Sequence, residues 1–203
     1  MEVASLTAFR YHPEAFFAWI RPLAERILQA EPNAAHRALA RLEAAGRMVG
    51  VVTQNIDGLH GRAGSLTVHE IHGHLREATC VTCYRRTSTD GLLTRFARTG
   101  ALPRCEACGG ILKPDVVLFG EQLPQQTVQA AQALLASSDL LLIAGSSLEV
   151  TPAALFPQRA LEAGARLIIV NREATYLDPR ADVVFRQDVI EVLPALADEV
   201  LSD

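Results

Sequence analysis

The chain has 203 residues, of which 49% are hydrophobic and 21% are charged, proportions typical of globular proteins. This length allows a buried core and fits one domain with a small insert. The net charge of −4 gives no support for binding nucleic acid through its phosphates, which requires a basic face. No run approaches the roughly 20 apolar residues of a membrane helix, and the N-terminus lacks the basic and apolar regions of a secretory signal. We therefore expect a cytoplasmic protein that binds neither membranes nor nucleic acid.

The first quarter of the sequence predicts two helices and a strand. Apolar residues at helical spacing predict a helix over residues 13–30, and Pro22 should kink or break it. A second helix over 34–45 follows Asn33, which is a favourable N-cap residue. The apolar run at 48–53 predicts a strand buried on both faces.

The second half of the sequence alternates strands and helices. Strands are predicted at 140–144, 166–170 and 182–185, with helices at 152–163 and 188–200. This alternation is the signature of a parallel sheet with helical crossovers. We therefore predict an α/β fold with a doubly wound, Rossmann-like parallel sheet, whose ligands should bind at the carboxyl ends of the strands.

A segment of different composition separates the two halves. It is rich in Arg, Thr and Gly, contains all four cysteines, and is interpreted as a small inserted module over residues 74–110. The Rossmann-like domain is then formed by residues 1–73 and 111–203, with a helical part at 1–46.

The cysteines occur as two CxxC pairs with 21 residues between them: Cys80 with Cys83, and Cys105 with Cys108. Two CxxC turns of this kind supply the four thiolates that bind one structural Zn²⁺ tetrahedrally in a zinc-ribbon module. The alternatives are a redox CxxC or four unrelated core cysteines, but a redox pair has no need of a second CxxC. Because four thiolates leave no open position, the metal should stabilise the fold and perform no chemistry.

Polar residues follow the predicted strands, and a histidine precedes the cysteine module. His72 lies between an apolar residue and Gly73, and a histidine with amide and carboxylate neighbours can act as a general base near neutral pH. The alternative is that His72 is a structural histidine held by hydrogen bonds.

Six motifs in order give the sequence its resemblance to a known family. The order of these motifs resembles that of the sirtuins, and the resemblance covers nearly the whole chain. The motifs are Thr53-Gln54-Asn55-Ile56-Asp57-Gly58-Leu59-His60, His72-Gly73, the two CxxC pairs, Lys113-Pro114-Asp115-Val116-Val117-Leu118-Phe119-Gly120-Glu121, Gly145-Ser146-Ser147-Leu148 and Val170-Asn171-Arg172-Glu173. No single motif is strong, but six in one order are specific.

The resemblance implies a role for each motif. His72 matches the catalytic base, and Asn55 and Asp57 complete the catalytic set. The residues implied to bind NAD, the cosubstrate, are Gln54, Asn55, Asp57, Gly145, Ser146, Ser147, Asn171, Arg172, Glu173 and Gln187. The residues implied to line the groove for an acetyl-lysine peptide, which pairs there as an added strand, are Val116, Val117, Phe119, Gly120, Glu149, Val150 and Thr151.

The resemblance also implies a reaction, NAD-dependent protein-lysine deacetylation by a monomer. The acetyl oxygen attacks C1′ of the nicotinamide ribose, nicotinamide leaves, and His72 activates a ribose hydroxyl. The products are lysine, nicotinamide and O-acetyl-ADP-ribose. The helical part at 1–46 covers the acyl-lysine tunnel, where Phe17 and Ile20 match a Tyr and an Arg of succinyl-preferring relatives. Neither can bind a carboxylate, so acetyl or longer apolar acyl groups are expected over succinyl.

One family feature is not found in the 203 residues. Sirtuins open with a strand and a Gly-Ala-Gly-x-Ser loop that holds the pyrophosphate, and no such stretch occurs here. We therefore expect the first strand of the sheet to be absent and the chain as given to have weak or no deacetylase activity. Two alternatives follow: a module that binds acyl-lysine or nucleotides without turnover, and a protein ADP-ribosyltransferase. A nucleic-acid zinc ribbon is disfavoured, because Arg85 and Arg86 are too few to indicate one.

Overall fold

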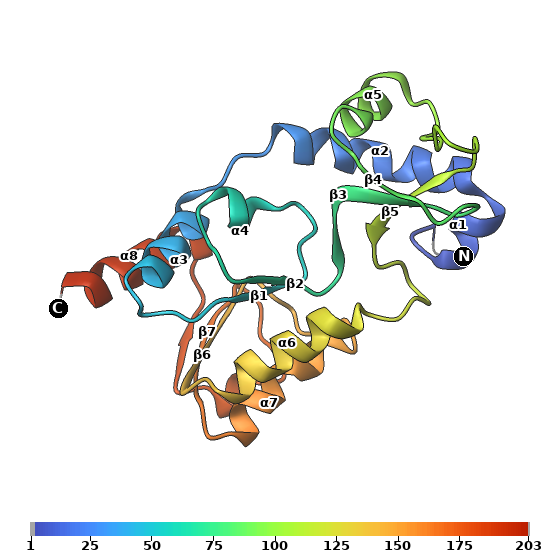
Figure 1. The fold of residues 1–203 in the computed structure, drawn as a ribbon. Helices are drawn as coiled ribbons and strands as arrows, with labels where there is room; N and C mark the ends of the chain where they lie inside the picture. The colour runs from blue at the N-terminus through green and yellow to red at the C-terminus, as the bar shows by residue number, and fades with distance from the viewer. Residues whose placement is uncertain (1–2, 203) are drawn as a thin grey trace. The chain divides into compact units, whose positions relative to one another are not determined.

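The computed structural model describes residues 3–202 (Figure 1). The chain forms two compact units, each built from segments distant in the sequence. Unit 1 contains Met1–Glu31, Asn55–Gly58 and His72–Pro124, and unit 2 contains Pro32–Gln54, Leu59–Ile71 and Gln125–Asp203. None of the helices in the described part of the chain is long and apolar enough to span a membrane.

Unit 1 packs helices against a small antiparallel sheet of order β4-β3-β5. Its elements are α1 (Leu6–Tyr11), α2 (Pro13–Gln29), β3 (Gly73–Cys80), β4 (Arg86–Ser88), α5 (Leu92–Thr99) and β5 (Leu112–Val116). The helix predicted over 13–30 is confirmed, but it continues through Pro22 without a break. Its buried face supplies Phe16, Phe17 and Ile20 to the core.

Aromatic rings form the centre of the unit 1 core. Phe9, Phe16 and Phe17 meet edge to face, with ring centroids 5.1 to 5.9 Å apart, and Phe96 of α5 packs on Phe17 at 5.3 Å. Edge-to-face contacts of this kind add to the free energy gained by burying the rings. The core therefore joins the N-terminal helices to the cysteine-containing segment.

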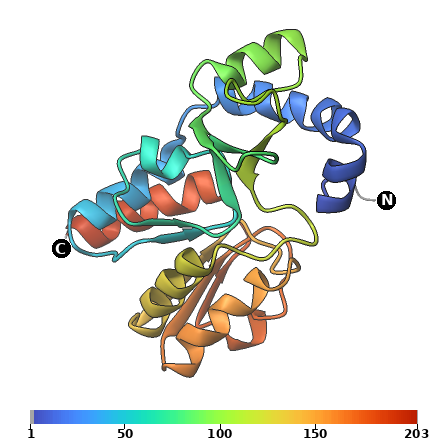
Figure 2. The same cartoon turned by 45° about the vertical axis from the view of Figure 1, so that its right-hand side comes forward.

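Unit 2 contains the parallel strands (Figure 2). Its first elements are α3 (Ala34–Ala44), β1 (Val51–Thr53), α4 (Leu59–Arg62) and β2 (Val68–Glu70), followed by α6 (Gln125–Ala136), β6 (Leu140–Ala144), η1 (Ala153–Leu155), α7 (Phe156–Glu162), β7 (Arg166–Val170), η2 (Asp178–Arg180), β8 (Val183–Phe185) and α8 (Val189–Ser202). Within residues 3–202 the parallel strands form two sheets, β1-β2 and β6-β7-β8.

Helices cover both faces of the β6-β7-β8 sheet, as a doubly wound fold requires. Alternate residues of β7 point to opposite faces: Leu167 and Ile169 pack in the cluster that includes Ala154 of η1, whereas Val170 packs with α3 and α8. All three side chains are fully buried, and α3 lies against α8. The predicted α/β fold with parallel sheets is confirmed.

The structure also corrects one predicted strand. The strand expected over 48–53 with both faces buried is only Val51–Thr53, and it is partly buried. Val49 is 62% exposed, because the chain at this point still belongs to the connection from α3. The apolar run therefore did not predict the residue at which the strand begins. The Asn33 cap is confirmed, since its side-chain oxygen accepts from the backbone N–H of His36.

Candidate functional site

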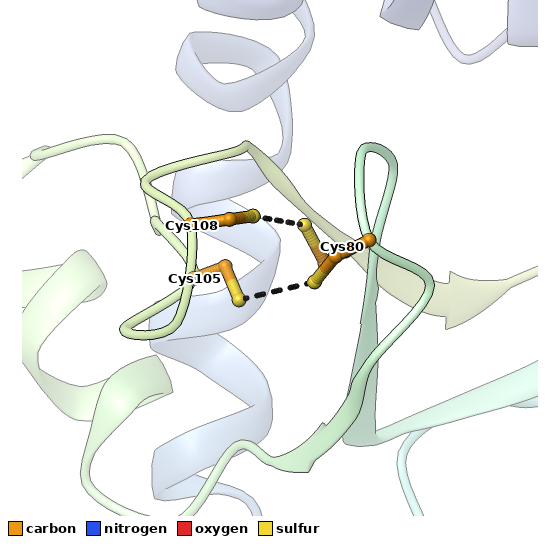
Figure 3. Close-up of side chains that lie close together, drawn as sticks. Cys80, Cys105 and Cys108 are labelled. Carbon is orange, nitrogen blue, oxygen red and sulfur yellow. Dashed lines mark hydrogen bonds between the residues drawn. The ribbon is translucent and has the colours of Figure 1, made fainter.

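The four cysteines of unit 1 converge on one point, as the spacing predicted. Cys80 ends β3, and the second pair lies in the turn before β5 (Figure 3). Their Sγ atoms all lie within 4.8 Å of one another, with 3.5 Å between Cys80 and Cys108 and 3.7 Å between Cys83 and Cys105. Tetrahedral ligands at the usual Zn–S length of about 2.3 Å would lie roughly 3.8 Å apart, so the cluster fits one zinc ion.

The backbone around the cysteines is shaped to this cluster. A Cβ on Gly110 would lie 2.5 Å from Oγ1 of Thr82 and 2.8 Å from Sγ of Cys80, so only glycine fits. The Thr82 backbone N–H donates to Sγ of Cys80 at 3.4 Å. The backbone N–H of Cys83 lowers the pKa of the Cys80 thiol to about 6, although burial acts in the opposite direction. A thiolate is therefore favoured at this position, as a metal ligand requires.

His72 lies immediately before β3 and is fixed to the segment that follows β5. Its carbonyl oxygen accepts from the backbone N–H of Val117 at 2.9 Å. Gly73 has φ +76°, and a Cβ there would lie 2.0 Å from the carbonyl oxygen of Asp115. The glycine after His72 is therefore required by the close approach of β3 and β5. Asn55 and Asp57 belong to the same unit as His72.

The segment of residues 116–120, which contains the predicted peptide-binding residues, is fixed by its own backbone contacts. Phe119 accepts from the Leu6 N–H at 2.9 Å and donates to the Ala4 carbonyl at 3.0 Å. Both backbone groups of Phe119 are therefore used within unit 1, and its side chain is 54% exposed. The other predicted groove residues are Glu149, Val150 and Thr151, which are exposed residues of unit 2 that follow β6.

Several predicted NAD-binding residues meet at the strand ends of unit 2. Gln54 follows β1, and its side-chain amide donates to Oγ of Ser146, after β6, at 3.4 Å. Gly145 has φ +59° and donates its N–H to the Val170 carbonyl at 2.9 Å. Ser147 is exposed beside them. The polar tips of β1 and β6 therefore lie together, as expected for parallel strands.

The loop after β7 is held by a residue that sequence reasoning missed. The Arg186 guanidinium donates to the carbonyls of Asn171, at 3.0 Å, and Glu173, at 2.9 Å, and it pairs with Asp178. The Asn171 side chain also donates to the Glu173 carbonyl. No motif marks Arg186, although it adjoins the exposed Gln187, which was predicted to contact adenine.

Carboxylates stabilise both ends of the β7-β8 pair in unit 2, Asp188 at the carboxyl end and Asp182 at the amino end. Asp188 accepts from the backbone N–H of Ile190 and pairs with Arg172, and these two contacts hold its pKa below the ordinary range despite some burial. Asp182 accepts from the backbone N–H of Leu167, which lowers its pKa, and Arg166 adds to the effect. Both aspartates are therefore ionised at neutral pH and hold β7, β8 and α8 together.

The comparisons with known proteins agree with these features. The Sir2 family model matches residues 1–152. An NAD-dependent protein deacetylase of Sulfurisphaera tokodaii is 43% identical over 201 residues, which are 99% of this chain and 79% of that protein.

Solved structures are similar over the whole chain. A structure described as a Sir2–p53 peptide–NAD⁺ complex has a TM-score of 0.90 and 36% identity, covering 100% of this chain and 84% of that one. Another, described as Sir2Tm bound to a propionylated peptide, has a TM-score of 0.91 at 36% identity and covers 99% of this chain and 84% of that one.

Proposed function

Because this chain belongs to the Sir2 family, we propose that it is an NAD-dependent protein-lysine deacetylase that releases nicotinamide and forms O-acetyl-ADP-ribose. The observation that carries the proposal is the alignment with a protein deacetylase over 99% of the chain. Solved relatives hold NAD⁺ and acylated peptides, which supports the same substrates here.

When bound, NAD supplies an electrophilic ribose carbon that accepts the acetyl oxygen. His72 then takes a proton from a ribose hydroxyl, as a neutral imidazole can near pH 7. Its backbone is fixed by the Val117 N–H and by the glycine that follows, so little freedom is lost when substrate binds. Asn55 and Asp57 hold the nicotinamide end.

In unit 2 the adenosine end of NAD is bound by polar strand tips. Ser146 offers a hydroxyl beside the Gln54 amide, and both groups suit a ribose or a phosphate. Asn171 is nearly buried, and Arg186 holds its loop in one conformation. Arg186 therefore supports the residues that border the adenosine without needing to contact NAD.

The zinc ion holds the fold of unit 1 and takes no part in the reaction. Its four thiolates leave no position for substrate. The hydrophobic cluster around the cysteines is small and consists of Ala78, Cys80, Cys105 and Leu112, with Leu92 packed against it. A segment with so little apolar burial needs the metal to fold.

The acyl group accepted should be neutral and apolar. Phe17 and Ile20 are both 4% exposed and line an apolar cavity of unit 1 together with Phe96. Among residues 3–202, no charged side chain lines this cavity. A succinyl carboxylate against Phe17 and Ile20 would find no partner on either side chain, and burying an unpaired charge is costly.

The test is mass spectrometry of the chain incubated with NAD and an acetyl-lysine peptide. We expect O-acetyl-ADP-ribose from the chain, in small amounts if turnover is weak, and none from His72→Ala. Binding of peptide and ADP-ribose without product would instead favour the binding module, and ADP-ribose transferred to protein would favour the transferase. A monomeric state in the cytoplasm stays a prediction, which sedimentation and localisation can test.

A further inference from the structure

A half-buried ion pair joins the two ends of the 116–120 segment. Nζ of Lys113, on β5, lies 3.0 Å from Oε2 of Glu121, and the side chains are only 17% and 22% exposed. An exposed pair would contribute little, but removing one partner of a pair sheltered from water is costly, because it leaves the other charge uncompensated.

Both side chains of the pair also bind backbone groups of the segment. Lys113 Nζ donates to the carbonyl oxygens of Pro114, at 3.2 Å, and Val116, at 2.8 Å. The Glu121 carboxylate accepts from the backbone N–H of Leu118 at 2.8 Å. The charges therefore pair with each other and with the backbone that they connect.

The segment has little regular structure to hold it otherwise. β5 ends at Val116, and beyond it the chain makes the His72–Val117 hydrogen bond and the single bridge between Ser5 and Phe119. Within residues 3–202, the Val117 carbonyl and the Gly120 N–H have no hydrogen-bond partner. These two groups are available to an incoming extended peptide, as strand addition requires.

We propose that Lys113 and Glu121 are positioning residues that hold the 116–120 segment in the conformation that accepts the acyl-lysine peptide. The inference rests on the proposed function, since it takes the peptide to bind at this segment. The two side chains bind each other and backbone groups of this segment, and neither residue belongs to the proposed NAD site. Its loss therefore weakens peptide binding and leaves NAD binding unchanged.

The primary experiment measures binding and does not depend on turnover. A fluorescein-labelled acetyl-lysine peptide is titrated with the zinc-loaded chain, and Kd is read from fluorescence anisotropy. Lys113→Met leaves the Glu121 carboxylate without its partner, and we expect Kd to rise about tenfold. Glu121→Gln keeps an acceptor for the Leu118 N–H, so a rise of about threefold is expected.

The matched control removes another ion pair of the same strand. Arg86 pairs with Asp115 of β5 at 2.7 Å and also with Glu77 of β3 at 2.9 Å, so Arg86→Gln removes both pairs. Asp115 keeps its hydrogen bond from Thr79 in this variant. We expect Arg86→Gln to leave the peptide Kd within twofold of wild type. The affinity for ADP-ribose, whose adenosine end binds unit 2, should be unchanged in all three variants, and circular dichroism checks that unit 1 stays folded.

Hydrogen exchange gives a second readout. Amides 117–120 should exchange faster in Lys113→Met than in Arg86→Gln. An unchanged peptide Kd and exchange rate in Lys113→Met, or an equal loss in the Arg86 control, would overturn the inference. Wild-type peptide binding without deacetylation would refute only the proposed activity, whereas a wild-type chain that does not bind peptide would overturn the inference too.

Discussion

The substitution Gly73→Ala tests the close approach of β3 to β5, which positions His72. The new Cβ would lie 2.0 Å from the Asp115 carbonyl oxygen and 3.0 Å from its carbon. That oxygen belongs to β5, so the substitution must push β3 away from β5 where Gly73 pairs with Val116. The perturbation is therefore steric and acts on backbone, which cannot move aside as a flexible side chain could.

Two costs add to give the expected loss of stability. A left-handed residue with a Cβ costs about 1–2 kcal/mol, and forced overpacking costs about 1–3 kcal/mol more. We expect Gly73→Ala to lower the free energy of unfolding by about 3 kcal/mol, or the melting temperature by roughly 6–12 °C for a chain of this size.

The control is Gly91→Ala. Gly91 has φ +72°, close to the +76° of Gly73, but nothing lies within 4 Å of the position of its Cβ. Gly91→Ala should therefore lower the free energy of unfolding only by the cost of a Cβ at positive φ, about 1–2 kcal/mol. The difference between the two variants isolates the contact with β5.

The assay is urea unfolding followed by the fluorescence of Trp19, the only tryptophan, which lies on α2 of unit 1. Zinc is kept in excess in every sample. Deacetylation rates are measured in parallel, and Gly73→Ala should be slower than Gly91→Ala because His72 is displaced. Equal losses of stability in the two variants would refute the reasoning.

Four further predictions concern the zinc cluster, Arg186, Asp182 and the acyl group. Chelation of zinc, or Cys108→Ser, should unfold the cysteine segment and abolish peptide binding; circular dichroism and anisotropy check this, and full binding without metal would contradict it. Arg186→Gln should weaken ADP-ribose binding about fivefold by calorimetry, whereas Arg180→Gln, an exposed control, should not. The pKa of Asp182 is lowered by folding, so its carboxylate stabilises the protein above the ordinary aspartate pKa and loses this effect as pH falls through the lowered value. The stability lost in Asp182→Asn should therefore be present at pH 7 and should shrink as the pH falls below the ordinary aspartate pKa of about 3.9; a difference constant with pH would exclude this cause. An acetyl peptide should be turned over faster than its succinyl counterpart, and the reverse order would show that an unrecognised cation faces the acyl group.

The sequence alone determined the features that depend on local spacing. The two CxxC pairs predicted the zinc cluster, because two intervening residues bring both thiols of a turn to one point. The apolar runs that became β6 and β7 were predicted with their bounds. Of the two, β7 packs on both faces, which requires consecutive apolar residues. The order of motifs likewise sufficed to identify the family.

Only the tertiary structure decided which ordinary charged residues support the site. Lys113 and Glu121 stand at the ends of one motif and Arg186 in none, but their spacing assigns them no partner. Their role depends on which backbone carbonyls and N–H groups come within reach after folding. The length of β1 was decided in the same way, because an apolar run shows hydrophobicity but does not show where a neighbouring strand begins to pair with it.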